Sequence, residues 1–80
     1  MPPIRFHNTA HVLQRASTRN LSLENIKNVV RYPTRKKKSY AGTHGGWVYT
    51  FEKTVDKVTL KVVAEIKVCD CWLITAYELS

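Results

Sequence analysis

Apolar and polar residues alternate along the second half of the chain with the period of a β-strand. Between residues 58 and 66 every second side chain is apolar, and residues 47–52 and 72–77 are rich in aromatic and β-branched residues. Successive side chains of a strand point to opposite faces, so alternation is typical of a strand with one buried face. We therefore predict an antiparallel meander of three strands with the last one central, and a fourth strand near 35–41.

The first half of the chain has the period of a helix instead. Val12, Leu13 and Ala16 fall on one arc of a helix predicted near 9–19, which Asn8 or Thr9 would cap. The preceding residues 1–7 contain two prolines, which resist helix formation, so we expect an extended lead-in.

A second helix is predicted over about 23–31. Its apolar residues recur at the spacing of one helical face, Ser22 is placed to cap it, and Pro33 marks its end. The elements together predict an α+β fold in which two N-terminal helices pack on one face of a three- to four-stranded antiparallel meander sheet.

Eighty residues predict a single domain over 1–80, with the lead-in at 1–7, two helices at 8–33 and the antiparallel sheet at 34–80. A chain of this size buries a modest core and has no room for a deep active site. We therefore expect any functional site to be an open cleft or a surface.

Positive charge dominates the composition. Thirteen Lys and Arg residues against six Asp and Glu give a formal net charge of +7, which indicates a polyanionic partner, with nucleic acid first and an acidic membrane or protein second. Five of these cations lie within residues 31–38, with tyrosines at positions 32 and 40. Such a run suits phosphates and stacked bases, although lysines also protect edge strands from aggregation. The predicted nucleic-acid-binding residues are Arg31, Arg35, Lys36, Lys37, Lys38, Tyr40 and His44.

Several other classes of site find no support in the sequence. Cys69 and Cys71 are separated by one residue, too close for an unstrained disulfide and too few for a zinc site, so we expect reduced thiols in a cytoplasmic protein. No signal peptide or transmembrane run is visible, and we expect no membrane partner. The acidic residues are scattered, and the glycines of 42–46 do not match a nucleotide-phosphate loop, so we predict no metal and no cofactor.

His11, Arg15 and Arg19 are spaced four residues apart. On a helix each such step advances the side chain by only about 40°, so the three would form one slowly drifting stripe. An imidazole that exchanges protons near neutral pH would then lie beside two permanent cations, which suits a phosphate. Helix geometry places His11 nearest to solvent, so a neighbouring loop or sheet edge is needed to complete a cleft.

The pattern His11-x3-Arg15-x3-Arg19-Asn20-Leu21-Ser22, followed by Leu73-Ile74-Thr75-Ala76-Tyr77, resembles the DUF4258 family. That family writes its first helix as H-A-x-x-R-M-x-x-R-G-I-S and its last strand as a hydrophobic-T-hydrophobic-Y run. The resemblance covers about residues 6–78. It departs from the pattern at Val12, Ala16 and Asn20, which stand where the family has Ala, Met and Gly.

The DUF4258 family is similar to the barnase–EndoU–colicin–RelE (BECR) group of metal-independent ribonuclease folds, which occur widely as toxins. The resemblance therefore implies a RelE/BECR-like α+β fold, with functional residues on the first helix and the last strand. Carried over position by position, the implied catalytic residues are His11, Arg15, Arg19, Thr75 and Tyr77.

We therefore expect a small, basic, toxin-like endoribonuclease that cleaves RNA, with tRNA or mRNA as the candidates, by attack of the 2′-hydroxyl. His11 would act as base or acid, the two arginines would clamp the phosphate, and Thr75 and Tyr77 would position the substrate. His44 is either a second proton carrier or an exposed loop residue. A cognate inhibitor or antitoxin is a further expected partner. The alternatives are a non-catalytic nucleic-acid-binding module of the same fold, and a protein-interaction protein of the phage accessory or antitoxin type.

Overall fold

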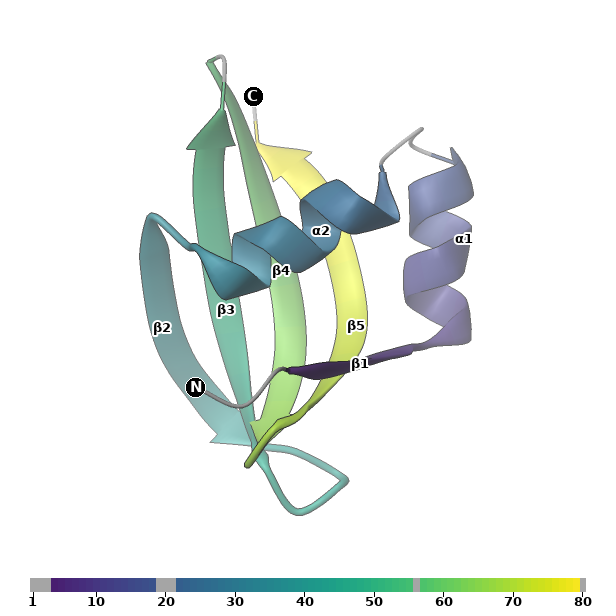
Figure 1. The fold of residues 1–80 in the computed structure, drawn as a ribbon, viewed down its shortest axis with the longest axis vertical. Coiled ribbons are helices and arrows are strands. Elements are labelled where there is room, and N and C mark those ends of the chain that lie inside the picture. The colour runs from purple at the N-terminus through teal and green to yellow at the C-terminus, as the bar shows by residue number, and fades with distance from the viewer. Residues whose placement is uncertain (1–3, 19–21, 56, 80) are drawn as a thin grey trace.

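The computed structural model describes residues 4–18, 22–55 and 57–79. These residues form two helices and five strands, in the order β1 (Arg5–Asn8), α1 (Ala10–Thr18), α2 (Leu23–Arg31), β2 (Arg35–Ala41), β3 (Trp47–Val55), β4 (Val58–Lys67) and β5 (Asp70–Leu79). The strands make one curved sheet in the spatial order β1-β5-β4-β3-β2. Figure 1 shows α2 lying across one face of this sheet and α1 beside β5 at its edge.

The predicted three- to four-stranded antiparallel sheet is wrong, because the described residues form five strands in a mixed sheet. The described part of the expected extended lead-in contains strand β1, which pairs in parallel with β5, so that Phe6 lies opposite Cys71. The amide of Arg5 donates to the carbonyl of Cys69 at 2.8 Å. A four-residue strand is too short to show an alternating pattern, and parallel pairing joins segments far apart in the sequence. The described part of the chain is mostly sheet, with two helices of nine residues each.

The core lies between α2 and the sheet, with α1 closing its edge. Phe51, Val62 and Ala76 are opposite one another on three neighbouring strands, and all are buried. Ile26 of α2 and Val12 of α1 belong to the same buried cluster. α2 therefore covers the sheet with its predicted apolar face, whereas of the predicted arc of α1 only Val12 and Ala16 are buried and Leu13 is 44% exposed. Neither described helix is long and apolar enough to cross a membrane.

A β-bulge in β5 marks the place where the sheet edge passes from β1 to α1. Val63 is opposite Thr75 but Ala64 is opposite Leu73, so Ile74 is an extra residue in β5. At the same place the Thr9 hydroxyl donates to the Leu73 carbonyl at 2.7 Å and accepts from the amide of Val12 at 3.2 Å. Thr9 therefore caps α1 and fixes it to β5 in one arrangement.

The predicted cap Ser22 and an ion pair stabilise the second helix. The Ser22 hydroxyl accepts from the amide of Asn25 at 3.4 Å, as an N-cap does. Glu24 in the first turn forms a 3.1 Å ion pair with Arg31 in the last turn. Both charges also oppose the partial charge of their helix end.

The turn between β4 and β5 stores backbone strain at Val68. Lys67 pairs with Asp70, so Val68 and Cys69 form a two-residue hairpin loop, and Val68 has φ +54° with 90% of its surface exposed. A β-branched residue is strained at positive φ, whereas glycine is not. We expect Val68→Gly to raise the free energy of unfolding by about 1 kcal/mol and the melting temperature by about 4–8 °C, as measured by circular dichroism. A lower melting temperature would show that the valine is not strained.

Candidate active site

His11 and Thr75 come together at the edge of the sheet, although 64 residues separate them. His11 lies in the first turn of α1 and is exposed, and its Nε2 is 3.1 Å from the Thr75 hydroxyl oxygen on β5. The Thr9 cap and the bulge at Ile74 fix the two elements that carry them. The first helix and the last strand therefore meet at the two residues that the resemblance implies.

Thr75 lies on the face of the sheet opposite α2, which we call the open face. Registered neighbours share a face, and the row Lys37–Thr50–Val63–Thr75 crosses β2, β3, β4 and β5 on this side. A second row on the open face is Arg35–Glu52–Lys61–Tyr77. An imidazole at the end of such rows is open to solvent and can exchange a proton with a bound ligand.

The remaining residues of the predicted catalytic set are placed only in part. Tyr77 lies on the open face, and its ring centroid is 5.9 Å from Nζ of Lys61. The backbone of Arg15 follows His11 by one turn of α1, but its side chain lies outside the described part of the structure. Arg19 lies outside the described residues altogether.

The predicted basic run does not make one surface, because β2 sends its side chains to opposite faces. Arg35 and Lys37 lie on the open face. Lys36 lies over the rings of Tyr49 and Phe51 on the other side, and Lys38 lies 4.0 Å from the ring centroid of Trp47. Only part of the run therefore shares a face with His11.

Of two further residues of the predicted binding set, Arg31 lies apart from this face and Tyr40 has no registered partner. Arg31 bonds to Glu24 and Asn28 on its own helix, and its guanidinium lies 5.0 Å from the ring centroid of Phe6. Tyr40 is 58% exposed near the end of β2, at the irregularity in its pairing with β3. Arg31 therefore stabilises the helix side of the molecule.

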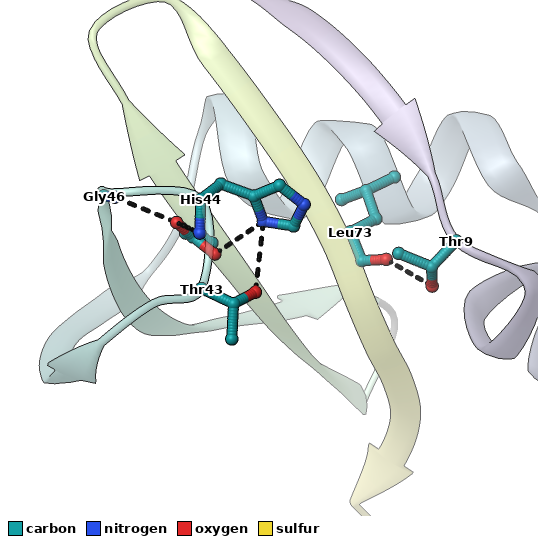
Figure 2. A network of polar contacts seen from close by, with 6 residues as sticks. Thr9, Thr43, His44, Gly46 and Leu73 are labelled. Atoms are coloured by element: carbon teal, nitrogen blue, oxygen red, sulfur yellow. Dashed lines mark hydrogen bonds and ion pairs between the residues drawn. The ribbon is translucent and has the colours of Figure 1, made fainter.

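Glu65 is the residue of the site that sequence reasoning missed. It lies on the open face of β4 and is only 1% exposed, because the loop of residues 42–46 covers it. Its carboxylate accepts the amides of His44 and Gly46 at 2.8 and 2.9 Å and bonds Nδ1 of His44 at 2.9 Å (Figure 2). Burial disfavours the charged form, but the hydrogen bonds outweigh burial and hold the pKa of Glu65 below its ordinary value.

The glycines of the loop allow it to close over this carboxylate. A Cβ atom on Gly42 would overlap the Glu65 side chain, and one on Gly46 would overlap the carbonyl of Ile66. Gly45 has φ +85°, which glycine adopts without strain. In the sequence, only the spacing of the glycines indicates a tightly closed loop here. It does not identify Glu65 as the residue of β4 that the loop contacts.

Trp72 lies opposite Glu65 on the neighbouring strand, and the rings of two histidines stack on it. The His44 ring stacks on it at 4.2 Å between centroids with an angle of 9°, and the His7 ring stacks at 5.1 Å and 18°. Nε2 of His7 and Nε of Arg5 lie 3.0 and 3.1 Å from one oxygen of Asp70. The His7 hydrogen bond, aided by the charge of Arg5, lowers the pKa of Asp70.

The two cysteines take separate places and are both free. Cys71 is buried in the core, and burial raises the pKa of its thiol to about 12. A thiol with so high a pKa stays protonated and unreactive at neutral pH. Cys69 lies in the β4–β5 turn, next to the strained Val68.

The buried carboxylate predicts acid sensitivity. Because Glu65 binds a proton less readily in the folded chain than in the unfolded chain, its contribution is complete above the ordinary value of 4.5 and is lost as the pH falls through the lower native pKa. We expect the free energy of unfolding, measured with urea, to fall with pH in this range. Glu65→Gln should reduce that dependence, whereas Glu78→Gln, at an exposed position, should leave it unchanged. An equal pH dependence in Glu65→Gln would contradict this role.

Comparison with known families gives one match, to the profile described as "Domain of unknown function (DUF4258)", over residues 8–78. The match spans both helices and the strands β2 to β5, so it includes His11, His44, Glu65 and Thr75. Neither the curated proteins nor the solved structures contain a match to this chain.

Proposed function

The chain belongs to the DUF4258 family, and from its site we propose that it is a small endoribonuclease that cleaves RNA by attack of the ribose 2′-hydroxyl, without a metal ion. One observation carries this proposal. An exposed imidazole, His11, is held 3.1 Å from the Thr75 hydroxyl at the open face of a basic protein. The contact supports a site at which an alcohol is bound within reach of a proton acceptor.

The Thr75 hydroxyl occupies the position at Nε2 of His11 that a ribose hydroxyl would take. When RNA binds there, His11 removes the proton of the 2′-hydroxyl while that oxygen attacks phosphorus. The bond from phosphorus to the 5′-oxygen breaks, and that oxygen takes up a proton from an acid. The products are a 2′,3′-cyclic phosphate and a 5′-hydroxyl. Arg15 and Arg19 are proposed to hold the phosphate oxygens, as the family resemblance implies.

The open face supplies a path for the rest of the strand. The row from Thr75 to Lys37 crosses three strand spacings, about 14 Å. Polar and cationic side chains on this row and on the neighbouring row ending at Tyr77 suit the sugar–phosphate backbone of a single strand. RNA lying across the strands would therefore place one phosphate at His11 and others near Arg35 and Lys37.

The test is a cleavage assay in EDTA. End-labelled tRNA and mRNA are incubated with the purified protein, and 2′,3′-cyclic phosphate ends are the expected product. An oligonucleotide with a single 2′-deoxyribose at the cleaved position serves as the matched control, which should remain intact at that position. Failure to cut any of the RNAs would reject the endoribonuclease.

The same surface supports a second function, a nucleic-acid-binding module that does not cut. Its specific support is that Arg35 and Lys37 lie on the open face whether or not His11 transfers a proton. Salt-sensitive RNA binding without cleavage would favour this module. Absence of RNA binding at low salt would instead favour a protein-interaction role.

Three further predictions belong to this proposal. A cognate inhibitor of the antitoxin type would cover the open face, where it would block His11. The protein would act in the cytoplasm. A relationship to the BECR ribonucleases would rest on the helix and strand that carry His11 and Thr75.

Adjacent lysines provide a matched pair of variants. Lys37 lies on the open face, and Lys38 lies over Trp47 on the other side. We expect Lys37→Gln to weaken RNA binding and to reduce the slope of log affinity against log salt by about 0.7, the value for one lost phosphate contact on a single strand. Lys38→Gln should leave the slope unchanged in the same filter-binding titration. Equal effects of the two variants would show that RNA does not follow the open face.

A further inference from the structure

His44 is fixed in place to a degree that is unusual for an exposed loop histidine. Its ring bonds Glu65 through Nδ1 at 2.9 Å, its amide bonds the same carboxylate at 2.8 Å, and its flat face stacks on Trp72 at 4.2 Å. Figure 2 shows the imidazole lying over β5, with its second nitrogen directed away from the carboxylate. Holding one ring in one orientation costs conformational entropy, and three separate contacts offset that cost.

Glu65 is buried where it bonds to this loop. A carboxylate that is 1% exposed is destabilising unless it is paired and hydrogen-bonded, and the described partners of Glu65 are His44 and Gly46. The lowered pKa of Glu65 keeps it ionised at neutral pH, so Nδ1 of His44 carries the hydrogen of their bond. Nε2 is then the nitrogen left to exchange protons with a ligand.

His44 and His11 flank one short length of β5. His44 stacks on Trp72 and His11 bonds Thr75, and both of these strand residues lie on the open face. Three residues along a strand, one of them a bulge, span about 7–10 Å. A phosphodiester bound between the two imidazoles would have its attacking oxygen near one of them and its leaving oxygen near the other.

We propose that His44, oriented by Glu65, is the acid that donates a proton from Nε2 to the leaving 5′-oxygen. This inference rests on the endoribonuclease proposed above and adds the group that its second half requires. One proton passes from the 2′-hydroxyl to His11 while another passes from His44 to the 5′-oxygen, as the P–O2′ bond forms and the P–O5′ bond breaks. Exchange with water then restores both histidines. Glu65 is a positioning residue, because it acts through His44.

His7 is the competing candidate among the described histidines. It also stacks on Trp72 and contacts a carboxylate, Asp70. That carboxylate is shared with Arg5 and its side chain is 25% exposed, so it holds the ring less firmly than the buried Glu65 does. His7→Ala is therefore the matched control for His44→Ala.

The deciding experiment replaces the leaving oxygen by sulfur. A 5′-bridging phosphorothiolate in a short RNA leaves as a thiolate, which needs no acid. His44→Ala is expected to cut ordinary RNA about 10²–10⁴-fold more slowly than the unmodified protein and to cut the sulfur substrate at nearly the unmodified rate. His7→Ala should resemble the unmodified protein on both substrates, and His11→Ala should be slow on both. In Glu65→Gln the limb of the pH–rate profile that reports the acid should move.

The remaining outcomes separate the two proposals. If the unmodified protein cuts RNA and His44→Ala cuts it equally fast, the role of His44 is rejected and the endoribonuclease stands. Equal losses of rate in His44→Ala on the oxygen and sulfur substrates would also reject the role of His44 as the acid, because they would indicate a role in binding. If His7→Ala is the variant rescued by sulfur, the acid is His7. If the unmodified protein cuts neither substrate, the endoribonuclease fails and the assignment of His44 fails with it.

Discussion

His11→Ala is expected to lower the rate of RNA cleavage by about 10²–10⁴-fold, the usual contribution of a general acid or base. RNA binding should change little, because the cations proposed to contact phosphates are untouched. The variant should also fold normally, since His11 is exposed and alanine is the residue that best favours a helix. Single-turnover cleavage of a labelled RNA, beside filter binding of a 2′-deoxy analogue, separates the two quantities.

Thr75→Val and Thr75→Ser form the matched pair for this prediction. Valine keeps the β-branched shape but removes the hydroxyl that lies 3.1 Å from Nε2 of His11, and serine keeps the hydroxyl. Valine should slow cleavage more than serine does if the hydroxyl positions the substrate, the role that the resemblance implies. Cleavage by His11→Ala at the unmodified rate would reject the assignment of His11, whatever the threonine variants do.

The second large effect is expected on stability, at Phe51. This side chain is 2% exposed and lies opposite Val62 on the face that α2 covers. Phe51→Ala leaves a cavity and should reduce the free energy of unfolding by about 3–5 kcal/mol. Small domains have only about 5–15 kcal/mol in total, so much of the protein would be unfolded at 37 °C.

Urea unfolding followed by tryptophan fluorescence measures this loss. Val58→Ala is a suitable control, because Val58 lies at the start of β4 and is 42% exposed. Val58→Ala is expected to lower the free energy of unfolding by less than about 1 kcal/mol. Equal midpoints for the two variants would show that the core does not lie between α2 and the centre of the sheet.

Periodicity in the sequence was sufficient for the elements whose pattern is long enough to read. The second helix begins and ends at the predicted residues. β4 contains the residues 58–66 whose apolar side chains alternate in the sequence. These elements carry six or more residues, so one face can be distinguished from the other.

The rest of the fold depends on pairing between distant segments, which periodicity does not report. β1 has four residues and becomes a strand only because the edge of β5 is available to it. The bulge at Ile74 is likewise invisible in the sequence, yet it decides that Thr75 and Trp72 share the open face. Without it, the two residues would point to opposite sides of the sheet.

The residues of the candidate site also divide into those that the sequence predicted and those that only the structure shows. The resemblance supplied His11 and Thr75, and the structure brings them together. The basic run was visible as composition, but only the register of β2 shows which of its lysines lie on the open face. Glu65 was missed because a polar residue at an outward position of a strand is the ordinary pattern, and nothing in the sequence shows that a loop folds over it.

The pairing of β1 with β5 joins a segment that is synthesised early to one that is synthesised late. A chain that has not yet been made beyond residue 69 lacks β5 and therefore lacks the partners of both β1 and His11. Contacts between such distant segments also form late in folding, because a long loop must close first. An unfinished chain therefore has no assembled site, because His11 meets Thr75 only after β5 has been added.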